Sequence, residues 1–465
     1  MDSTERISAF EKRLKRQVIG KPHRFLAVVP LGFEKTFVDE LENRLGARDA
    51  RDKESSSSFD VKIAGDGKVV FTAKLVDAWK VVAYSRIANR ILMHIADFKA
   101  ENFRELEKKA AEIPWELYLS DEKRVNIHVT CKHSRLYHSD AVAERLQKVI
   151  EGGSLPLAAA PAGSSATPSA GAPRNAPKSE EIVLPQNLYV TLIDDRCTLW
   201  LDLAGEELYK RGHERFVNDA PLKETIAAGM IFEAIHRAKS NLITLIDPMA
   251  GSGTFSLEAA YMANGLIPGK CRDFALKHQP AFKPATWDFL IRRETRDERR
   301  EKGNNILKII TSDISEKAVS IITHNVGCSP LADTALSAAT PTVNPQFRDF
   351  FSYTAKEIAD LCGESAPIIV LNPPYGKRLD FDAPKLYTQI GKKLAELTRE
   401  LAPIGKQLTI AILAPKDDSR PSSKYTCTAN LLHECPALNP QQNSDAKCIV
   451  TSHGGISLNA IIARI

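Results

Sequence analysis

The chain has 465 residues, of which 43% are hydrophobic and 26% are charged, and this predicts a globular protein of two or three domains. The formal net charge of +5 is compatible with a nucleic-acid partner but does not demonstrate one. No apolar run reaches the roughly 20 residues of a membrane span, and the first residues lack the apolar core of a signal peptide. The eight cysteines are scattered without a CxxC pair, which favours reduced thiols, and we find no cluster of metal ligands. We therefore expect a cytoplasmic protein with neither a membrane nor a metal partner.

The front of the chain begins with residues 1–23, which are predicted to be a basic N-terminal tail. Its basic run, residues 12–24, suits either a solvated face or contact with nucleic acid. Residues 24–206 then alternate between helix-like and strand-like segments, so we expect a compact α+β unit. Strands are predicted at 25–29, 67–75 and 125–131, and helices at 33–45, 76–89 and 103–112.

Three features complete this first unit. Residues 131–140 interleave basic and aromatic side chains before a predicted helix at 141–150, which suits either phosphate contact or a polar loop with one packed tyrosine. Residues 152–180 are almost entirely Gly, Ala, Ser and Pro, so we expect a disordered insertion within the unit. Strands at 188–193 and 197–203 should form a hairpin that completes the sheet.

Residues 207–465 contain repeated β-α units, which predict a doubly wound, mostly parallel sheet with one terminal strand. Asn218 or Asp219 is predicted to cap a helix that ends at Ala238. A charged helix at 287–302 is expected to be a solvated face. The other predicted strands are 242–246, 306–312, 368–371, 408–413 and 456–465, and the other helices are 255–264, 316–326, 354–361 and 386–401.

A glycine-rich turn follows the predicted strand 242–246. Gly251 and Gly253 let the backbone approach a ligand closely, and Asp247 ends the strand beside that space. Ser256 stands where a dinucleotide site would have a third glycine, and no Walker sequence is present. A carboxylate here would repel a pyrophosphate but attract ammonium or sulfonium charge, and S-adenosylmethionine has both. The turn consists of Asp247, Pro248, Met249, Ala250, Gly251, Ser252, Gly253 and Thr254.

Two further aspartates follow at strand ends. Asp313 could accept both hydroxyls of a ribose, or cap the helix after it, or both. Asp349 could accept from an adenine amino group while a neighbouring phenylalanine packs on the ring, or it could be a loop residue before core aromatics. Ligands bind at the carboxyl ends of strands in such sheets. Asp247 with its glycines, Asp313, Asp349 and the turn 372–375 fall in order at successive strand ends, and together they are stronger evidence for a ligand site than any one of them.

The apolar strand 368–371 ends in a stiff turn of Asn372, Pro373, Pro374 and Tyr375. Neither proline donates a backbone hydrogen bond, and Pro373 keeps Asn372 out of helical torsions. The Asn372 amide oxygen and the Pro373 carbonyl can accept from one planar amino group, while the Tyr375 ring offers a face to a base. The turn therefore suits an exocyclic amino group of a nucleobase, although a plain surface turn after a core strand is the alternative.

These motifs give the chain a family resemblance. Residues 207–465 resemble class I S-adenosylmethionine-dependent methyltransferases whose Asn-Pro-Pro-Tyr motif methylates exocyclic amino nitrogens. Residues 134–145, 208–215 and 220–224 resemble a narrower group, the THUMP-domain RNA guanine-N2 methyltransferases, particularly those of large-subunit ribosomal RNA. The resemblance implies that residues 24–206 form a ferredoxin-like plus THUMP module that binds RNA, ahead of a Rossmann-like methyltransferase domain.

The resemblance also implies S-adenosylmethionine as the cofactor and RNA as the partner, with ribosomal RNA favoured over tRNA. The alternatives are a tRNA guanine-N2 methyltransferase, a DNA adenine-N6 methyltransferase with a domain that reads the major groove, and a non-catalytic RNA-binding protein. Arg348, where the family often has glycine, and the insertion are departures that do not touch the proposed chemistry. Lys223 and Glu224 line the cofactor pocket by resemblance alone. The predicted catalytic residues are Asn372, Pro373, Pro374 and Tyr375, and the predicted cofactor-binding residues are Asp247, Pro248, Gly251, Ser252, Gly253, Thr254, Asp313, Asp349 and Lys223.

Overall fold

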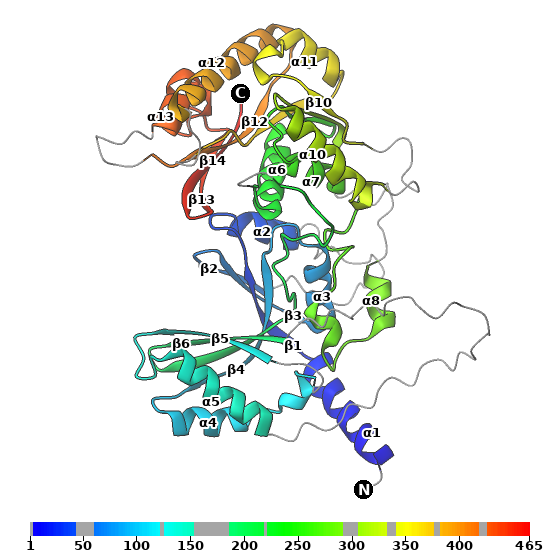
Figure 1. Ribbon diagram of the computed structural model, residues 1–465, viewed down its shortest axis with the longest axis vertical. Helices are drawn as coiled ribbons and strands as arrows, with labels where there is room; N and C mark the ends of the chain where they lie inside the picture. The colour runs from blue at the N-terminus through cyan, green and yellow to red at the C-terminus, as the bar shows by residue number, and fades with distance from the viewer. Residues whose placement is uncertain are drawn as a thin grey trace, which may run out of the picture.

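Two seven-stranded sheets organise the protein, one built from each half of the chain (Figure 1). The predicted disordered insertion, apart from its first residue, and the charged stretch 292–302 lie outside the residues that are described, so those two predictions stay predictions. In the described part of the chain, no helix has the length and apolar character needed to cross a bilayer. The computed structural model describes residues 3–42, 60–120, 125–152, 186–217, 221–291, 306–332, 341–375, 382–417 and 426–465.

The first sheet has the strand order β2-β3-β1-β4-β7-β6-β5, and only its β5–β6 pair is parallel. The predicted hairpin is confirmed, because β6 and β7 pair antiparallel across a turn in which Asp194 and Asp195 have positive φ angles of 50° and 61°. Strands β2 and β4 were not predicted. The strands are β1 (Pro22–Val28), β2 (Asp60–Gly65), β3 (Lys68–Lys74), β4 (Arg90–Lys99), β5 (Val125–Lys132), β6 (Gln186–Ile193) and β7 (Arg196–Asp202).

Helices cover this sheet and precede it. The basic stretch before β1 is helical, and Leu14 and Val18 from it are buried in the core. Asn102 caps α4 by accepting a hydrogen bond from the Glu105 amide at 3.0 Å. The helices are α1 (Ser3–Leu14), α2 (Glu34–Glu40), α3 (Leu75–Tyr84), α4 (Phe103–Ala111) and α5 (Ser139–Gly152).

The second sheet has the order β10-β9-β8-β11-β12-β14-β13; its first five strands pair in parallel, and β14 pairs antiparallel with both β12 and β13. The predicted doubly wound, mostly parallel sheet is therefore confirmed. It ends in a hairpin of β13 and β14 and not in the single terminal strand that was predicted, because β13 was not foreseen. The chain runs from β8 outward to β10 and returns on the other side of β8 at β11, so the strand order reverses between β8 and β11. The strands are β8 (Ile243–Asp247), β9 (Ile306–Asp313), β10 (Pro345–Phe347), β11 (Ala366–Leu371), β12 (Thr409–Pro415), β13 (Ala446–His453) and β14 (Ile456–Arg464).

Side chains alternate across the buried strands of this sheet, so each face has its own core. On β11, Ile368 and Val370 join the core under α6 and α7, whereas Ile369 and Leu371 join the core under α11, α12 and α13. The predicted caps Asn218 and Asp219 lie outside the described residues, and the helix they were to cap begins later, at Glu224. The helices are α6 (Glu224–Ala238), α7 (Thr254–Ala263), α8 (Pro284–Leu290), α10 (Glu316–Gly327), α11 (Ala355–Cys362), α12 (Ala383–Leu401) and α13 (Cys427–Glu434).

Helix α2 of the first half packs directly on α6 of the second half. Phe33 lies against Gly229, where an added Cβ would be 2.6 Å from the Phe33 ring, so a larger residue at 229 would separate the helices. The Thr36 hydroxyl donates to the Glu233 carboxylate at 2.7 Å, and Lys447 from β13 donates to the same oxygen at 3.0 Å. Apolar packing and a partnered buried carboxylate thus join the two halves here.

A buried ion-pair triad makes a second connection between the halves. Arg211 donates through Nε and Nη2 to the two carboxylate oxygens of Glu258 on α7, at 2.9 and 3.1 Å. Arg86, which lies between α3 and β4, places Nη1 3.6 Å from the same carboxylate. All three side chains are at most 9% exposed. The helix that follows the glycine-rich turn is therefore tied to the first sheet through charge.

Candidate active site

Four neighbouring parallel strands end at one edge of the second sheet. In spatial order they are β10, β9, β8 and β11, and their ends are marked by Asp349, Asp313, Asp247 and Asn372 in the same order. In open α/β sheets, ligands bind outside the carboxyl ends of the strands where the strand order reverses, which here is between β8 and β11. The fold thus brings the four predicted features to a single edge, and their roles stay predictions.

The glycine-rich turn after β8 is fixed by backbone contacts. The Ala250 amide donates to the Ser312 carbonyl of β9 at 3.1 Å, and the Gly253 amide donates to the Ala250 carbonyl at 2.7 Å. Gly251 and Gly253 have φ angles of +58° and +80°, which favour glycine. A Cβ on Gly253 would lie 3.1 Å from two carbons of Ile322 on α10, whereas a Cβ on Gly251 would meet no atom of the described residues within 4 Å. Gly253 therefore serves packing, and Gly251 faces open space.

Asp247 is fully buried at the end of β8. Its Oδ2 accepts hydrogen bonds from the amide and the hydroxyl of Ser256 on α7, at 3.2 and 2.7 Å. No donor in the described part of the chain reaches its Oδ1, which is also buried. Burial raises the pKa of Asp247 to about 7, although the Ser256 hydrogen bonds oppose that shift. Ser256, which stands where a dinucleotide site would have its third glycine, thus orients the Asp247 carboxylate through Oδ2 and leaves Oδ1 without a donor from the described residues.

Asp313 holds two loops together at the end of β9. Its Oδ2 accepts from the Gly251 amide at 2.8 Å, and its Oδ1 accepts from the Ser315 amide at 2.9 Å. The helix-cap alternative is wrong for this residue, because Ser315 caps α10 by accepting from the Ala318 amide at 3.3 Å. Asp313 thus fixes the position of the glycine-rich turn relative to β9.

Asp349 caps the short 3-10 helix Phe350–Ser352 that follows β10, accepting from the Phe351 amide at 3.0 Å. The expectation that an adjacent phenylalanine faces a ligand ring is not met by Phe350, which is 2% exposed and lies in the core. The exposed apolar side chains at this edge are instead Phe347, at 62%, and Ile314, at 65%. Sequence reasoning missed both, although Ile314 directly follows Asp313 and Phe347 is two residues before Asp349.

Arg348, which departs from the family pattern, forms a bidentate ion pair with Glu357 on α11, with the longer contact at 2.6 Å. Its guanidinium also lies 3.7 Å from the centre of the Tyr353 ring. The arginine therefore has a structural partner on both sides. Its presence beside Asp349 is explained by packing between β10 and α11.

The turn after β11 exposes Pro374 and buries Pro373, while Asn372 and Tyr375 are half-buried. The Asn372 Oδ1 atom is buried and accepts no hydrogen bond from any residue that the structure describes. Tyr375 packs on the core under α6, and burial raises its pKa to about 12, so its phenol stays neutral at physiological pH. The turn thus presents an unused acceptor beside a fixed aromatic ring.

The hydroxyls of Ser252 and Thr254 are bound by an arginine that sequence reasoning missed. Arg215 donates through Nη2 to both hydroxyls, at 3.2 and 2.5 Å. It also forms an ion pair with Glu224 at the start of α6. Burial raises the pKa of Glu224, and Arg215 opposes that shift. Arg215 therefore holds the glycine-rich turn against α6.

Two other predicted cofactor residues flank this cluster. Lys223, the N-cap of α6, has its ammonium group 3.8 Å from a Glu207 carboxylate oxygen and 4.5 Å from the centre of the Tyr209 ring. Pro248 is buried at the start of the turn. Lys223 is thus occupied by neighbours on the segment before α6, and its contact with a cofactor stays a prediction.

Comparison with known proteins agrees with this arrangement. The UPF0020 family model, described as an RMKL-like methyltransferase domain, matches residues 211–411. The chain is 29% identical over 390 residues to the ribosomal RNA large subunit methyltransferase K/L of Syntrophotalea carbinolica, covering 80% of this chain and 47% of that protein. The relative of the same name in Shewanella frigidimarina is 27% identical over 383 residues, covering 79% and 46%. The chain thus spans about half the length of these relatives, and the resemblance to large-subunit ribosomal RNA methyltransferases is confirmed.

Solved structures share the fold across nearly the whole chain. A possible methylase from Clostridium difficile 630 aligns with a TM-score of 0.65 at 21% identity, covering 95% of this chain and 98% of that one. SMU.472, a candidate methyltransferase complexed with SAH, aligns with a TM-score of 0.65 at 20% identity, again covering 95% and 98%. TrmN from Thermus thermophilus aligns with a TM-score of 0.53 at 15% identity, covering 95% and 100%. The predicted class I methyltransferase fold, with an α+β unit ahead of it, is confirmed.

Proposed function

We propose that this chain is an S-adenosylmethionine-dependent RNA methyltransferase that modifies the exocyclic N2 amino group of a guanosine in large-subunit ribosomal RNA. The observation on which this depends most is the buried Asn372 Oδ1, which accepts no hydrogen bond from a described residue and lies beside the reversal point of the sheet. Leaving a buried acceptor unpaired costs about 1–3 kcal/mol, so a donor from a ligand is expected. The names of the matched relatives favour ribosomal RNA, and the SAH in SMU.472 supports the cofactor.

The turn after β11 would position the amino group for methylation. One N–H would donate to Asn372 Oδ1 and the other to the Pro373 carbonyl. The lone pair of a guanine amino group is delocalised into the ring, and holding both hydrogens favours a pyramidal nitrogen with a directed lone pair. Tyr375 would stack on a base that is swung out of its helix. Positioning and local electrostatics would therefore supply most of the acceleration.

The other three strand ends fit a nucleoside cofactor. Bound S-adenosylmethionine would supply an electrophilic methyl group on a positively charged sulfur. No described atom lies within 4 Å of a Cβ built on Gly251, which leaves room for a ligand against the backbone, and the Asp247 Oδ1, which no described donor reaches, lies at the end of β8. Asp313 would accept from the ribose hydroxyls and Asp349 from the adenine amino group. The exposed side chains of Ile314 and Phe347 would cover the faces of the adenine ring.

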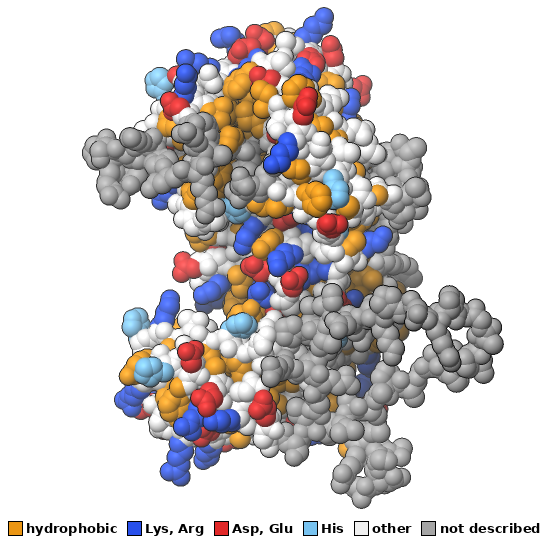
Figure 2. Space-filling model, in the orientation of Figure 1, with side chains coloured by type: hydrophobic (Ala, Val, Ile, Leu, Met, Phe, Trp, Pro, Cys, Tyr) orange, Lys and Arg blue, Asp and Glu red, His pale blue; other side chains and the backbone are white. Residues whose placement is uncertain are grey.

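We place RNA contact in the first half, with residues 24–206 as the RNA-binding module and 207–465 as the methyltransferase domain. Tyr137 offers an aromatic face on this half: it is 69% exposed, and its ring centre lies 4.1 Å from that of the basic residue His138. Among the side chains coloured in Figure 2, basic and acidic groups are interspersed on the face shown. Stacking with local charge, and not a uniform basic field, would then bind single-stranded RNA.

The test is transfer of labelled methyl groups from S-adenosylmethionine to ribosomal RNA, tRNA or DNA, followed by digestion to nucleosides. We expect N2-methylguanosine in the ribosomal RNA pool. Asn372→Ala should lower the rate about 100- to 1,000-fold, the usual cost of removing one positioned hydrogen-bonding group. Asn344→Ala, the same change at an exposed position before β10, is the matched control and should not alter the rate.

Other products would redirect the proposal. N2-methylguanosine in tRNA alone would change the substrate but keep the chemistry. N6-methyladenine in DNA would overturn the assignment of the first half to RNA. Full transfer by Asn372→Ala would exclude the proposed acceptor. Cofactor binding without transfer to any naked pool would require the same assay on partly assembled ribosomal particles, and failure there would support a protein that only binds RNA.

A further inference from the structure

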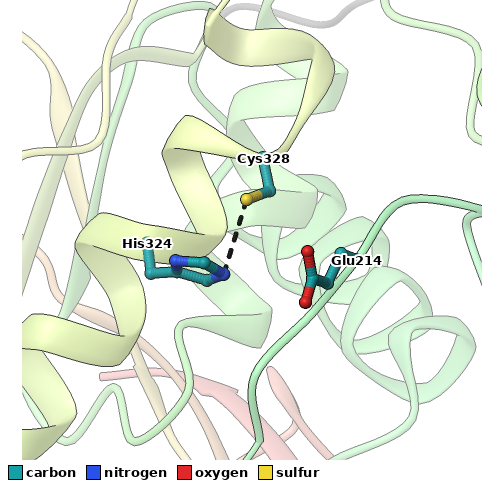
Figure 3. A group of neighbouring side chains, drawn as sticks. All are labelled: Glu214, His324 and Cys328. Carbon is teal, nitrogen blue, oxygen red and sulfur yellow. Dashed lines mark hydrogen bonds between the residues drawn. The ribbon is translucent and has the colours of Figure 1, made fainter.

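Three potential metal ligands meet on the surface of the second half, outside the candidate active site. His324 lies in the last turn of α10, Cys328 is the C-cap residue of that helix, and Glu214 lies on the segment that leads to α6 (Figure 3). This cluster is not apparent from the sequence, because Glu214 is far from the other two residues along the chain. The spacing of His324 and Cys328 is nevertheless one that places two side chains on the same face of a helix.

The separation of His324 and Cys328 fits a tetrahedral site, and Glu214 lies close to both. One nitrogen of His324, one sulfur of Cys328 and one oxygen of Glu214 all lie within 4.8 Å of one another. The His324 Nε2 and Cys328 Sγ atoms are 3.4 Å apart. Zinc bonds of about 2.0–2.3 Å place neighbouring ligands roughly 3.3–3.8 Å apart, so the pair on α10 already has the required separation. Glu214 is exposed and points toward the pair, so a small rotation of its side chain would complete a three-ligand set (Figure 3).

The imidazole of His324 is held in place before any ion binds. Its ring is stacked on Phe216, with the ring centres 3.8 Å apart and the planes inclined by 10°. Phe216 is itself fixed by the Asn325 side chain, which accepts from its amide at 2.8 Å and donates to its carbonyl at 2.9 Å. Ligands that are already oriented lose less entropy on binding, so this support favours a site over a chance encounter of side chains.

We propose that Glu214, His324 and Cys328 bind a divalent transition-metal ion of the zinc class, with a fourth position open to water. Thiolate, imidazole and carboxylate together suit zinc, whereas magnesium and calcium prefer oxygen ligands alone. The ion would join the segment before α6 to α10. It would act close to the glycine-rich turn, because Asn325 also donates to the Ser252 carbonyl at 3.1 Å. This proposal does not depend on the methyl-transfer reaction.

The test is titration of the metal-free, full-length protein with Co²⁺, a coloured substitute for zinc. We expect equimolar binding, a thiolate-to-cobalt charge-transfer band, the strong visible bands of four-coordinate cobalt, and displacement of cobalt by Zn²⁺. Cys328→Ser should abolish the charge-transfer band, and His324→Ala should weaken binding at least about 100-fold, more than loss of an outer-shell contact. Cys271→Ser and Cys448→Ser, which change other exposed cysteines, are the matched controls and should bind normally.

Two results would overturn the proposal: the absence of saturable binding, or a charge-transfer band that survives Cys328→Ser and disappears in a control variant. Zn²⁺ should also raise the midpoint of thermal unfolding of the natural protein but not of Cys328→Ser. If His324→Ala or Cys328→Ser fails to fold, Glu214→Gln still tests the site, because it changes only an exposed side chain outside α10. It should retain the circular dichroism spectrum and weaken Zn²⁺ binding about tenfold, and unchanged affinity would remove Glu214 from the ligand set.

Discussion

Buried polar groups lie both at the contact between the two halves and at the carboxyl edge of the second sheet, and the two sets differ in their partners. Every nitrogen of the Arg211 guanidinium and both oxygens of Glu258 have partners within the protein. Asp247 and Asn372, in contrast, each keep one buried oxygen that no described residue satisfies. The first set stabilises the fold without a ligand. The second set has a cost in free energy that a ligand can remove.

The largest expected effect on stability is in the first set. Glu258→Ala leaves Arg211 and Arg86 buried without their carboxylate, so we expect the free energy of unfolding to fall by about 3–5 kcal/mol. Urea denaturation measures this. Lys35→Ala, which removes an exposed pair with Asp39 at 3.1 Å, is the control and should cost less than about 0.5 kcal/mol. A loss below about 1 kcal/mol for Glu258→Ala would contradict the claim that the partnered groups between the two halves stabilise the fold.

The next effect concerns the pH dependence that Asp247 confers. Its pKa is about 7 in the folded protein, against the ordinary value of 3.8 that applies when the chain is unfolded. The folded state therefore binds the proton more tightly, and this contribution to stability is complete below about pH 4 and is lost as the pH rises through about 7. We expect a loss on the order of 2–3 kcal/mol between about pH 5 and about pH 8.

Comparison with Asp247→Asn isolates this contribution from all other titrating groups. Urea unfolding of both proteins at the two pH values should show a smaller decrease for the variant. Equal decreases would mean that Asp247 is already ionised in the folded protein at low pH. Saturating cofactor should also reduce the decrease in the natural protein, if a donor from the ligand reaches the free oxygen and stabilises the ionised form.

The two glycines of the turn offer a matched pair with intermediate effects. Gly253→Ala adds strain at φ +80° and a contact with Ile322, so we expect a stability loss of about 1–3 kcal/mol. Gly251→Ala meets no described neighbour and should lose only about 1 kcal/mol, yet its methyl group would enter the proposed ligand space. We therefore expect Gly251→Ala to weaken S-adenosylmethionine binding at least about tenfold, as measured by calorimetry. Unchanged affinity would show that the space beside Gly251 is not the cofactor site.

The smallest expected effect on stability is at Asn372. Because its Oδ1 has no donor within the described residues, Asn372→Ala removes an unsatisfied atom together with a little packing. We expect the free energy of unfolding to change by less than about 1 kcal/mol, while the rate of methyl transfer falls about 100- to 1,000-fold. A drop of several kcal/mol in the urea assay would place Asn372 with Glu258, as a residue that holds the fold.

The strand-end features could be predicted from sequence because each is local. An apolar run followed by Asp247 and two glycines, or by Asn372 and two prolines, specifies both the strand and the turn after it. The order of such units then places their ends at one edge of a parallel sheet. Strands β4 and β13 are not followed by such a turn motif, and their pairing with β7 and β14 depends on residues elsewhere in the chain.

The partners of the predicted residues were harder to foresee. Arg215 contacts Ser252 and Thr254 only because the segment before α6 returns beside the turn, and nothing in its local sequence indicates this. Phe350 was a reasonable candidate for an aromatic contact, but the short 3-10 helix after Asp349 directs it into the core and leaves Phe347 exposed. Contacts between distant segments, rather than secondary structure, therefore account for most of what was missed.

The apolar core has a consequence for how the protein unfolds. One cluster of buried side chains runs from Leu14 through the first sheet to Ile462 on β14. Segments that share a core tend to open together, so amide hydrogens on β1 and β8 are expected to exchange with a similar opening free energy. A destabilising change such as Phe71→Ala, deep in the first sheet, would then lower the population of intact active sites in the second. Such variants would lose activity through abundance, with no change in the chemistry of the molecules that remain folded.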